Sequence, residues 1–219
     1  MILAIYGAGG QGKEVREIVE EENELLHLWS KVIYIDDFQI EGYQQDTERL
    51  HFETAVNMGE TEDIEYVVAL GEPEDKRIIY SKLKKSGCNI GTVISPDAKI
   101  SKYAQLGKGV IIKRGAIVSP GVRIGANTTI QSYSCIGHDA IIGDNCQIST
   151  HVVVGGGTVI GDNVFVGLNV PIREKLKIGN NVVVSAGSVV LKDILSDVTV
   201  MGNPARVIEK HNSNKKILK

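Results

Sequence analysis

Residues 135–160 read CIGHDAIIGDNCQISTHVVVGGGTVI, and an aliphatic residue returns in this segment at every sixth position. The same spacing continues in both directions through residues 93–194. A fixed period of six is typical of a hexapeptide β-helix, in which three short strands make one triangular coil, whereas an antiparallel sheet predicts a period of two. Seventeen blocks, three to a coil, predict between five and six coils stacked about 4.8 Å apart. The aliphatic residues expected to point inward are Ile94, Ile100, Leu106, Ile112, Val118, Ile124, Ile130, Ile136, Ile142, Ile148, Val154, Ile160, Val166, Ile172, Ile178, Val184 and Val190.

Length and composition bound the other possibilities. The chain has 219 residues, 42% of them hydrophobic, and a formal net charge of −3, which argues against a general nucleic-acid binder. No apolar run approaches the ~20 residues that span a bilayer, and Met1 leads into a short strand without a signal peptide. The three cysteines are too scattered for a disulfide framework or a zinc site. These features favour a soluble, cytoplasmic protein.

A glycine-rich loop follows the first expected strand. After the apolar run 2–6, Gly7, Gly9 and Gly12 form the pattern G-x-G-x-x-G, and residues 13–25 read as an amphipathic helix. Such a loop lets backbone N–H groups approach a phosphate at a helix N-terminus. A second strand over 32–35 ends in Asp36 and Asp37, which can accept hydrogen bonds from a ribose hydroxyl. The alternative is a glycine turn that packs strand against helix and binds nothing.

The remaining N-terminal segments alternate between strands and helices, a pattern typical of a parallel sheet. We expect a short helix over 47–57, a strand over 64–70, a helix over 72–86 and a strand over 89–94. Only half of a dinucleotide-binding fold is present, which favours a mononucleotide or a nucleotide-sugar over NAD. The expected domains are a half-Rossmann α/β domain over 1–92, an all-β coil over 93–204, and a C-terminal segment over 205–219. In this last segment, Val207 and Ile208 are expected to cap the coil, and a solvated tail is expected from His211 onward.

One histidine stands out by its position in the repeat. His138 comes two residues after an inward position, near a corner of the coil, and Asp139 follows it directly. An imidazole beside a carboxylate can take up a proton near pH 7. Gly156, one coil further along, should stack over His138, where its backbone N–H can face a developing oxyanion. The other histidines, for which surface or structural roles are expected, are His27, His51, His151 and His211.

The chain resembles, over nearly its whole length, the bacterial sugar acyltransferases of the sialic-acid O-acetyltransferase and PglD type. These belong to the left-handed β-helix hexapeptide acyltransferases. The residues that carry the resemblance are Tyr6–Gly12 (YGAGGQG), Ile35–Asp37 (IDD), Ala69–Gly71 (ALG), Ile136–Ala140 (IGHDA), Ser185–Val189 (SAGSV) and Gly202–Ala205 (GNPA).

The resemblance implies a left-handed coil and a homotrimer with acetyl-CoA in the groove between neighbouring coils. It implies N-acetylation of a nucleotide-activated amino sugar, of the UDP-4-amino-sugar type, for bacterial glycan biosynthesis without a metal. His138 would be the general base, Asp139 its acidic neighbour, and Gly156 the backbone donor to the thioester carbonyl. The implied acetyl-CoA contacts are Gly155, Gly156, Leu168, Ala186 and Gly187. The implied contacts to the nucleotide-sugar are Gly7, Gly9, Gly10, Gln11, Asp36, Asp37 and Gly71.

Three positions depart from the pattern of the family, and they bear on the acceptor more than on the reaction. Gln11 stands where the family often has His or Ser, and Glu72 stands where an amide side chain is common. Gln131 lies in the six-residue block before the one that contains His138, where related chains often have Asn. Gln11 carries no charge at pH 7, which changes its contacts with a sugar or phosphate.

Four alternatives stay open at this point. The acceptor can be a sugar hydroxyl, for example on sialic acid, or the reaction can pass through an acyl group on Cys135, although the position of this residue suggests packing. A zinc carbonic anhydrase of the same coil needs three histidine ligands, and only His138 and His151 lie on the coil. A non-catalytic scaffold would need neither the glycine loop nor the alignment of His138 with Gly156.

Overall fold

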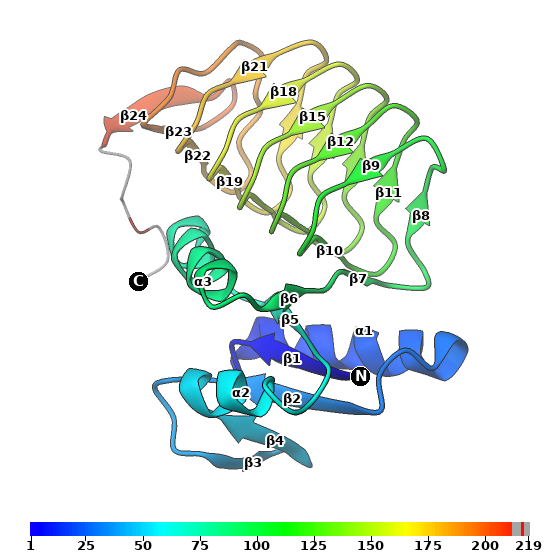
Figure 1. Cartoon of the computed structure of the whole chain (residues 1–219). Helices are drawn as coiled ribbons and strands as arrows, with labels where there is room; N and C mark the ends of the chain where they lie inside the picture. The colour runs from blue at the N-terminus through cyan, green and yellow to red at the C-terminus, as the bar shows by residue number, and fades with distance from the viewer. Residues whose placement is uncertain (212–215, 217–219) are drawn as a thin grey trace.

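The computed structural model describes residues 1–211 and Lys216, and it contains two regions of different architecture (Figure 1). The N-terminal region is an α/β unit around a six-stranded sheet, and the second region is a prism of short parallel strands. The helices α1 (Gly10–Leu26) and α3 (Pro73–Lys85) lie next to the prism, and α2 (Phe52–Met58) lies further from it. None of the helices among residues 1–211 is both long enough and apolar enough to cross a membrane.

The N-terminal sheet is centred on β1 (Ile2–Tyr6), which pairs in parallel with β2 (Lys31–Ile35) on one side and β5 (Ile64–Val68) on the other. The full strand order is β3-β4-β2-β1-β5-β6. Only β3 (Gly42–Gln44) runs antiparallel to its neighbour, at the edge of the sheet. The predicted alternation of parallel strands and helices is therefore confirmed, with one antiparallel edge strand that the sequence did not reveal.

Two local predictions in this region were wrong. The helix predicted over 47–57 begins only at Phe52, because Thr47–Leu50 form strand β4, which pairs with both β2 and β3. The single strand predicted over 89–94 is two strands, interrupted at Gly91, whose N–H donates to the Tyr66 carbonyl oxygen. Of these, β6 (Asn89–Ile90) completes the N-terminal sheet and β7 (Val93–Ile94) begins the prism.

The prism has three faces, each a column of parallel two-residue strands. The first face packs against the N-terminal region and contains β7, β10 (Ile111–Ile112), β13 (Thr129–Ile130), β16 (Gln147–Ile148), β19 (Phe165–Val166) and β22 (Val183–Val184). The second face contains β8 (Lys99–Ile100), β11 (Ile117–Val118), β14 (Cys135–Ile136), β17 (Val153–Val154) and β20 (Pro171–Ile172). The third face contains β9 (Gln105–Leu106), β12 (Arg123–Ile124), β15 (Ile141–Ile142), β18 (Val159–Ile160) and β21 (Lys177–Ile178).

The interior of the prism follows the six-residue period. All the aliphatic residues predicted to point inward belong to one hydrophobic cluster, and each fully buried side chain contributes roughly 1.5–3 kcal/mol. Small residues at the intervening inward positions let the chain turn at the corners, and their hydroxyls bond to the backbone. Thr128 Oγ1, for example, donates to the Gly143 carbonyl oxygen at 2.7 Å, and Ser134 Oγ donates to that of Ser149 at 2.8 Å. The fold prediction of a hexapeptide β-helix is thus confirmed.

The repeat shortens at its C-terminal end. Ile178 pairs with Ile194 and Val184 with Val200, so the last coil has lost two residues from the eighteen-residue spacing. Strand β23 (Val198–Met201) then turns through a cis Asn203–Pro204 bond into the antiparallel strand β24 (Arg206–Lys210). Val200 and Ala205 pack on the core at this end, but Val207 and Ile208, predicted to cap it, are exposed. The solvated tail predicted from His211 onward lies, except for His211 and Lys216, outside the described residues.

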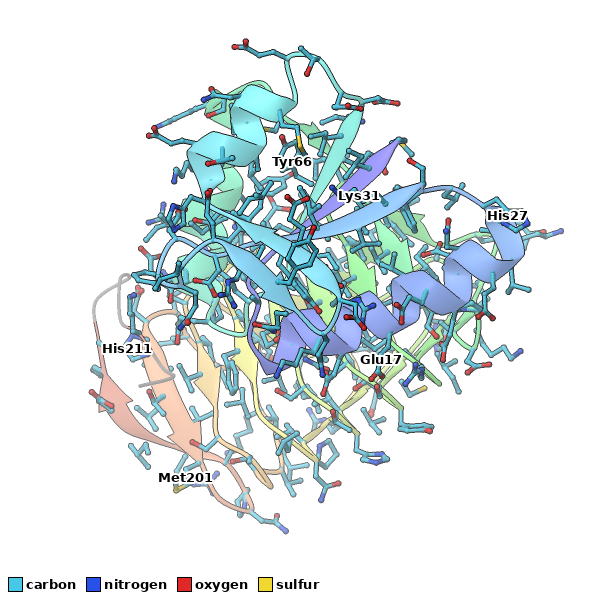
Figure 2. All side chains as sticks on the ribbon, turned by 90° about the horizontal axis from the view of Figure 1, so that it is seen from below. Glu17, His27, Lys31, Tyr66, Met201 and His211 are labelled. Carbon is cyan, nitrogen blue, oxygen red and sulfur yellow. The ribbon has the colours of Figure 1, made fainter. Side chains whose placement is uncertain are left out.

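The N-terminal region is joined to the first face by apolar and charged contacts. Val93 and Ile111 of the prism share a hydrophobic cluster with Val15, Ile18 and Val19 of α1. Nearby, the buried Lys113 ammonium pairs with the Glu14 carboxylate of α1, and Arg114 pairs with Glu21. Glu17, which also faces Arg114, is visible on α1 beside the prism in Figure 2. These contacts hold the start of α1 against the prism.

A buried lysine forms a second connection between the two regions. Lys76 of α3 is 0% exposed, and its Nζ donates to Thr129 Oγ1 at 2.8 Å and to the Cys146 carbonyl oxygen at 3.0 Å. Burial, and to a smaller extent the charge of Lys113, lowers the pKa of Lys76 to about 7, although Cys146 has a raising effect. The ammonium therefore tends to lose its proton when the protein folds.

This burial predicts a pH-dependent effect of Lys76→Met on stability. Between pH 7 and 10.5 the unfolded chain holds more protons at this position than the folded chain does, so the destabilising effect of Lys76 decreases as pH rises through that window. The thermal midpoint of the wild type, relative to that of the variant, should therefore increase from pH 7 to pH 10. A difference between the two midpoints that does not change with pH would show that Lys76 is not neutral in the folded state.

Candidate active site

His138 lies at the corner between the second and third faces, which we call the second corner. It follows strand β14, and its side chain is 72% exposed. The Asp139 carboxylate lies 2.8 Å from Nδ1 of the ring, and this residue adopts a left-handed backbone with φ of 59°. A carboxylate at Nδ1 favours the tautomer in which Nδ1 carries the proton, and this leaves Nε2 as the proton acceptor. The corner therefore presents a base toward the outside of the prism.

Gly156 lies one coil further along, directly beside the ring of His138. β14 and β17 pair with Ile136 opposite Val154, and a Cβ atom on Gly156 would lie 2.6 Å from His138 Nε2. The stacking predicted from the spacing is therefore present, and a side chain at position 156 would displace the His138 ring.

The Gly156 N–H group has no acceptor among residues 1–211. The N–H groups on either side of it are used: Gly155 donates to the Ile172 carbonyl oxygen at 2.9 Å, and Gly157 donates to that of His138 at 2.8 Å. A backbone N–H without a partner, next to an imidazole, is the arrangement that can stabilise an oxyanion while the ring moves a proton.

The predicted acetyl-CoA contacts are divided between two corners. Gly155 and Gly156 lie with His138 at the second corner. Leu168, Ala186 and Gly187 instead lie at the first corner, between the first and second faces, where the Gly187 N–H donates to the Leu168 carbonyl oxygen at 2.8 Å. The second face separates these two groups, so a single chain does not bring the whole predicted set together.

The second face itself carries exposed apolar side chains. Ile117 is 45% exposed and Val153 is 48% exposed, on either side of the half-buried Cys135. Together with the exposed Pro171, they form an apolar column between the two corners. Contiguous exposed apolar surface of this kind is typical of a contact with another protein chain.

A pocket opens at the carboxyl ends of β1, β2 and β5, where ligands bind in open α/β sheets. This strand-end pocket has a volume of about 470 Å³. Predicted residues that line it are Gly7, Asp36 and Asp37; Gly71 does not, although its neighbour Leu70 does. Three further lining residues, Tyr6, Ile78 and Lys82, were not predicted, because nothing in the pattern of a strand or helix indicates which residue faces a pocket formed by several elements.

Asp37 is occupied by contacts within the protein. Its carboxylate accepts hydrogen bonds from Tyr6 Oη at 2.5 Å and from the Phe52 N–H at 2.7 Å, and Lys82 Nζ lies 3.3 Å away. Burial raises the pKa of Asp37, but these three partners outweigh burial and hold the pKa below its ordinary value. Asp37 therefore positions its neighbours at the rim of the pocket. Asp36 is the carboxylate that can accept more hydrogen bonds from a ligand.

A second pocket, of about 340 Å³, lies between the glycine loop and the first corner. This loop pocket is lined by Gly10, Gln11 and Glu14 from α1 and by Gln131, Ser149, Thr150 and Leu168 from the prism. Within the described residues, neither the buried Nε2 of Gln11 nor the hydroxyl of Ser149, a residue only 6% exposed, has a hydrogen-bond partner. Two polar groups without partners in one pocket indicate a place for a polar ligand. Ser149 was not predicted as a site residue, because nothing in the six-residue repeat distinguishes its position from the equivalent positions in other coils.

The glycines of the loop divide into two kinds. A Cβ atom on Gly7 would lie 2.9 Å from the Ala69 carbonyl oxygen, and one on Gly12 would lie 1.9 Å from that of Gly7. Packing of strand against helix accounts for these two. Gly9 and Gly10, in contrast, have no atom within 4 Å of such a Cβ, so packing does not explain them. They leave open space at the start of α1, where no side chain caps the helix.

None of the other four histidines lines either pocket. His27 ends α1 in a left-handed conformation, and it lies far from Met201 and His211 at the end of the prism (Figure 2). His51 precedes α2, and the ring of His151 stacks on Tyr133 with centroids 5.5 Å apart. Residues 1–211 contain no group of three or more His, Cys, Asp or Glu side chains arranged to hold a metal ion.

Comparison with known proteins gives consistent results for both regions. Residues 2–83 match the model of the PglD N-terminal domain, and residues 89–176 match that of the GMPPB C-terminal domain. Among solved structures, the chain is similar to the acetyltransferase domain of PglB from Neisseria gonorrhoeae FA1090, with 26% identity, a TM-score of 0.88, and coverage of 94% of this chain and 99% of that one. It is also similar to WeeI from Acinetobacter baumannii AYE, with 26% identity, a TM-score of 0.80, and coverage of 95% and 100%. A search among curated proteins found no significant match.

The α/β region followed by a prism of hexapeptide repeats defines the chain as a left-handed β-helix acyltransferase. Both domains and the arrangement between them are shared with the PglB domain and WeeI over almost the full length of each chain. The chain is similar to the PglD-type hexapeptide acyltransferases, in sequence over its N-terminal region and in structure over nearly its whole length.

Proposed function

We propose that the protein transfers an acetyl group from acetyl-CoA to the amino group of a nucleotide-activated amino sugar, with His138 as general base. The observation that carries this proposal is the free N–H of Gly156 beside His138 Nε2, which pairs an oxyanion donor with a base at one corner. A structure of the PglB domain from Neisseria gonorrhoeae FA1090 in complex with acetyl coenzyme A, 27% identical with a TM-score of 0.88, supports acetyl-CoA as the donor.

The nucleotide-sugar would span the two pockets of the N-terminal region. The strand-end pocket includes Gly7 and the loop pocket includes Gly10 and Gln11, so the glycine loop connects them. The nucleobase would lie in the strand-end pocket. The diphosphate would lie across the loop at the N-terminus of α1, where backbone N–H groups and the helix dipole favour an anion. The sugar would then reach the loop pocket, close to Gln11 and Ser149.

The chemistry at the second corner would proceed by direct transfer. The sugar amine attacks the thioester carbonyl carbon, a C–N bond forms, and the carbonyl electrons move to the oxygen, which accepts a hydrogen bond from the Gly156 N–H. His138 Nε2 takes the proton from the attacking nitrogen, and the Asp139 carboxylate stabilises the imidazolium. Collapse of the intermediate breaks the C–S bond, and His138 returns the proton to the CoA sulfur.

A homotrimer would complete this site. The loop pocket lies at the first corner of a chain, whereas its own His138 lies at the second corner, across the second face. Packing of the apolar column of Ile117 and Val153 against a neighbouring chain would place the second corner of one protomer beside the first corner of the next. That arrangement would also reunite Gly155 and Gly156 with Leu168 and Gly187 around one CoA molecule. We place the enzyme in the cytoplasm, where its three free thiols stay reduced.

Gly10→Ala tests whether the loop binds the nucleotide-sugar. The new methyl group meets no protein atom within 4 Å, and alanine is the better residue in a helix, so the thermal midpoint should stay the same or rise. The KM for the nucleotide-sugar should nevertheless increase, because the methyl group occupies the space of the ligand, and the KM for acetyl-CoA should not change. An unchanged KM for the sugar would contradict the placement of the diphosphate at this loop.

The acceptor atom is tested with matched substrates. The purified protein is incubated with acetyl-CoA and pairs of UDP-, GDP- and dTDP-sugars that differ only in having an amine or a hydroxyl at one position, and products are measured by mass spectrometry. We expect the mass of one acetyl group to be added to an amino sugar and not to its hydroxyl partner. Acetylation of the hydroxyl sugars, or of free sialic acid, would instead establish O-acetylation, and no acetylation of any sugar would contradict the proposal.

A further inference from the structure

The polar side chains of the strand-end pocket are mostly engaged with one another. Asp37 accepts from Tyr6 and from the Phe52 N–H, and Asp75 pairs with Lys216 at 2.7 Å. These groups can form few further hydrogen bonds with a ligand.

Two polar side chains of the pocket retain that capacity. Asp36 accepts a hydrogen bond from the Phe38 N–H through Oδ1 at 2.9 Å, and its Oδ2 has no partner among the described residues. Lys82 has three N–H donors on Nζ; one faces Asp37 at 3.3 Å, and the group lies 3.7 Å from the centroid of the Phe52 ring. These contacts hold the ammonium in place and leave a donor for a ligand. The pocket therefore offers one fixed acceptor and one fixed donor.

The remaining walls suit a flat, apolar group. Leu70 and Ile78 line the pocket, Ile78 with 46% of its surface exposed, and Phe38 at the rim is 96% exposed. A nucleobase has apolar faces that pack against such side chains and a polar edge that needs hydrogen-bond partners. The phosphates of the ligand, in contrast, are better placed at the glycine loop, outside this pocket.

We propose that the strand-end pocket selects bases with a lactam edge, namely uracil, thymine or guanine, because Lys82 donates to the ring carbonyl and Asp36 accepts from the adjacent ring N–H. This inference rests on the nucleotide part of the proposed function. Cytosine and adenine carry the reverse pattern, an amino donor beside a ring nitrogen that accepts. In the same orientation they would set their amino group against the Lys82 ammonium and their ring nitrogen against the Asp36 carboxylate. A mismatch that leaves such groups unpaired weakens binding by roughly ten- to a hundredfold.

Calorimetric titration with free nucleoside diphosphates tests this inference, because UDP, GDP, CDP and ADP differ only in the base. The wild type should bind UDP or GDP at least roughly tenfold more tightly than CDP and ADP. Lys82→Met should lose most of that preference, and Asp36→Asn should weaken binding of the preferred diphosphate. Lys85→Met, at the exposed end of the same helix, is the matched control and should retain the wild-type preference. Thermal unfolding of each variant establishes that it is folded.

The outcomes separate this inference from the proposed function. Equal affinity of the wild type for all four diphosphates would overturn the selection of the base, even if acetyl transfer to a nucleotide-sugar is observed. An equal loss for all four diphosphates in Lys82→Met would also overturn it, because Lys82 would then contact a phosphate. A preference for UDP or GDP without any acetyl transfer would support the selection of the base and contradict the proposed reaction.

Discussion

Replacing His138 by alanine should lower the rate of acetyl transfer by roughly 10²–10⁴-fold, because the group proposed to take the proton from the attacking amine is removed. The side chain is 72% exposed and, among the described residues, forms a side-chain hydrogen bond with Asp139 alone, so its loss should leave the fold intact. The measurement is kcat for acetyl transfer, with size-exclusion chromatography to show that the assembly of the variant matches that of the wild type.

His27→Ala is the matched control for this experiment. His27 is exposed at the end of α1, remote from both pockets, and its replacement should leave kcat near the wild-type value. Near-normal turnover in the His138 variant would remove the general base from the proposed mechanism. A loss of turnover together with loss of the assembly would instead show that His138 acts through structure.

Gly156→Ala should have the second large effect, a loss of about 10²–10⁴ in kcat with little change in stability, because it displaces the general base. The new Cβ would lie 2.6 Å from His138 Nε2, and the exposed ring can rotate away, so the catalytic geometry is lost while the prism is kept. The measurements are kcat and the thermal midpoint of the variant.

Gly155→Ala is the comparison variant, because its added Cβ would meet backbone and not a side chain. At that position a Cβ would lie 2.4 Å from the backbone nitrogen of Glu174, which cannot move without shifting a coil, so this variant should lose stability as well as activity. If Gly156→Ala also unfolds at a markedly lower temperature, the glycine is required for packing, and the loss of activity does not test the position of the His138 ring. If the variant keeps full activity, the position of the ring beside residue 156 is not needed for catalysis.

The repeat made most of the prism predictable. A period of six allows only one face of each short strand to be buried, so the inward residues, the coil and the neighbour of His138 all follow from counting. Left-handed residues such as Asn127 and Asn145 at the corners agree with the known tolerance of Asn for that conformation. The shortened last coil was not predicted. The six-residue period would place Ser196 and Gly202 inward, whereas the aliphatic residues Ile194 and Val200 take those places two residues earlier.

The parts that the sequence did not reveal depend on contacts between distant segments. Thr47–Leu50 became a strand because β2 and β3 offered partners on both sides, which overrides weak local preference. The buried Lys76 meets Thr129 and Cys146 only when α3 packs on the prism. Likewise, Asp37 was predicted to contact ribose, yet Tyr6 and Phe52 already use its oxygens. The division of the predicted acetyl-CoA contacts between two corners follows from the three-sided path of the coil, and only the proposed trimer would reunite them.

In the proposed mechanism, the Gly156 N–H binds the thioester carbonyl oxygen while His138 Nε2 takes the proton from the amine that attacks this carbonyl. The most direct test is a crystal structure of the protein with an unreactive acetyl-CoA analogue and a nucleotide amino sugar. We expect the analogue's carbonyl oxygen within hydrogen-bond distance of the Gly156 nitrogen, and the sugar amine within hydrogen-bond distance of His138 Nε2. A carbonyl bound at any other coil, or a sugar amine that does not reach His138, would contradict it.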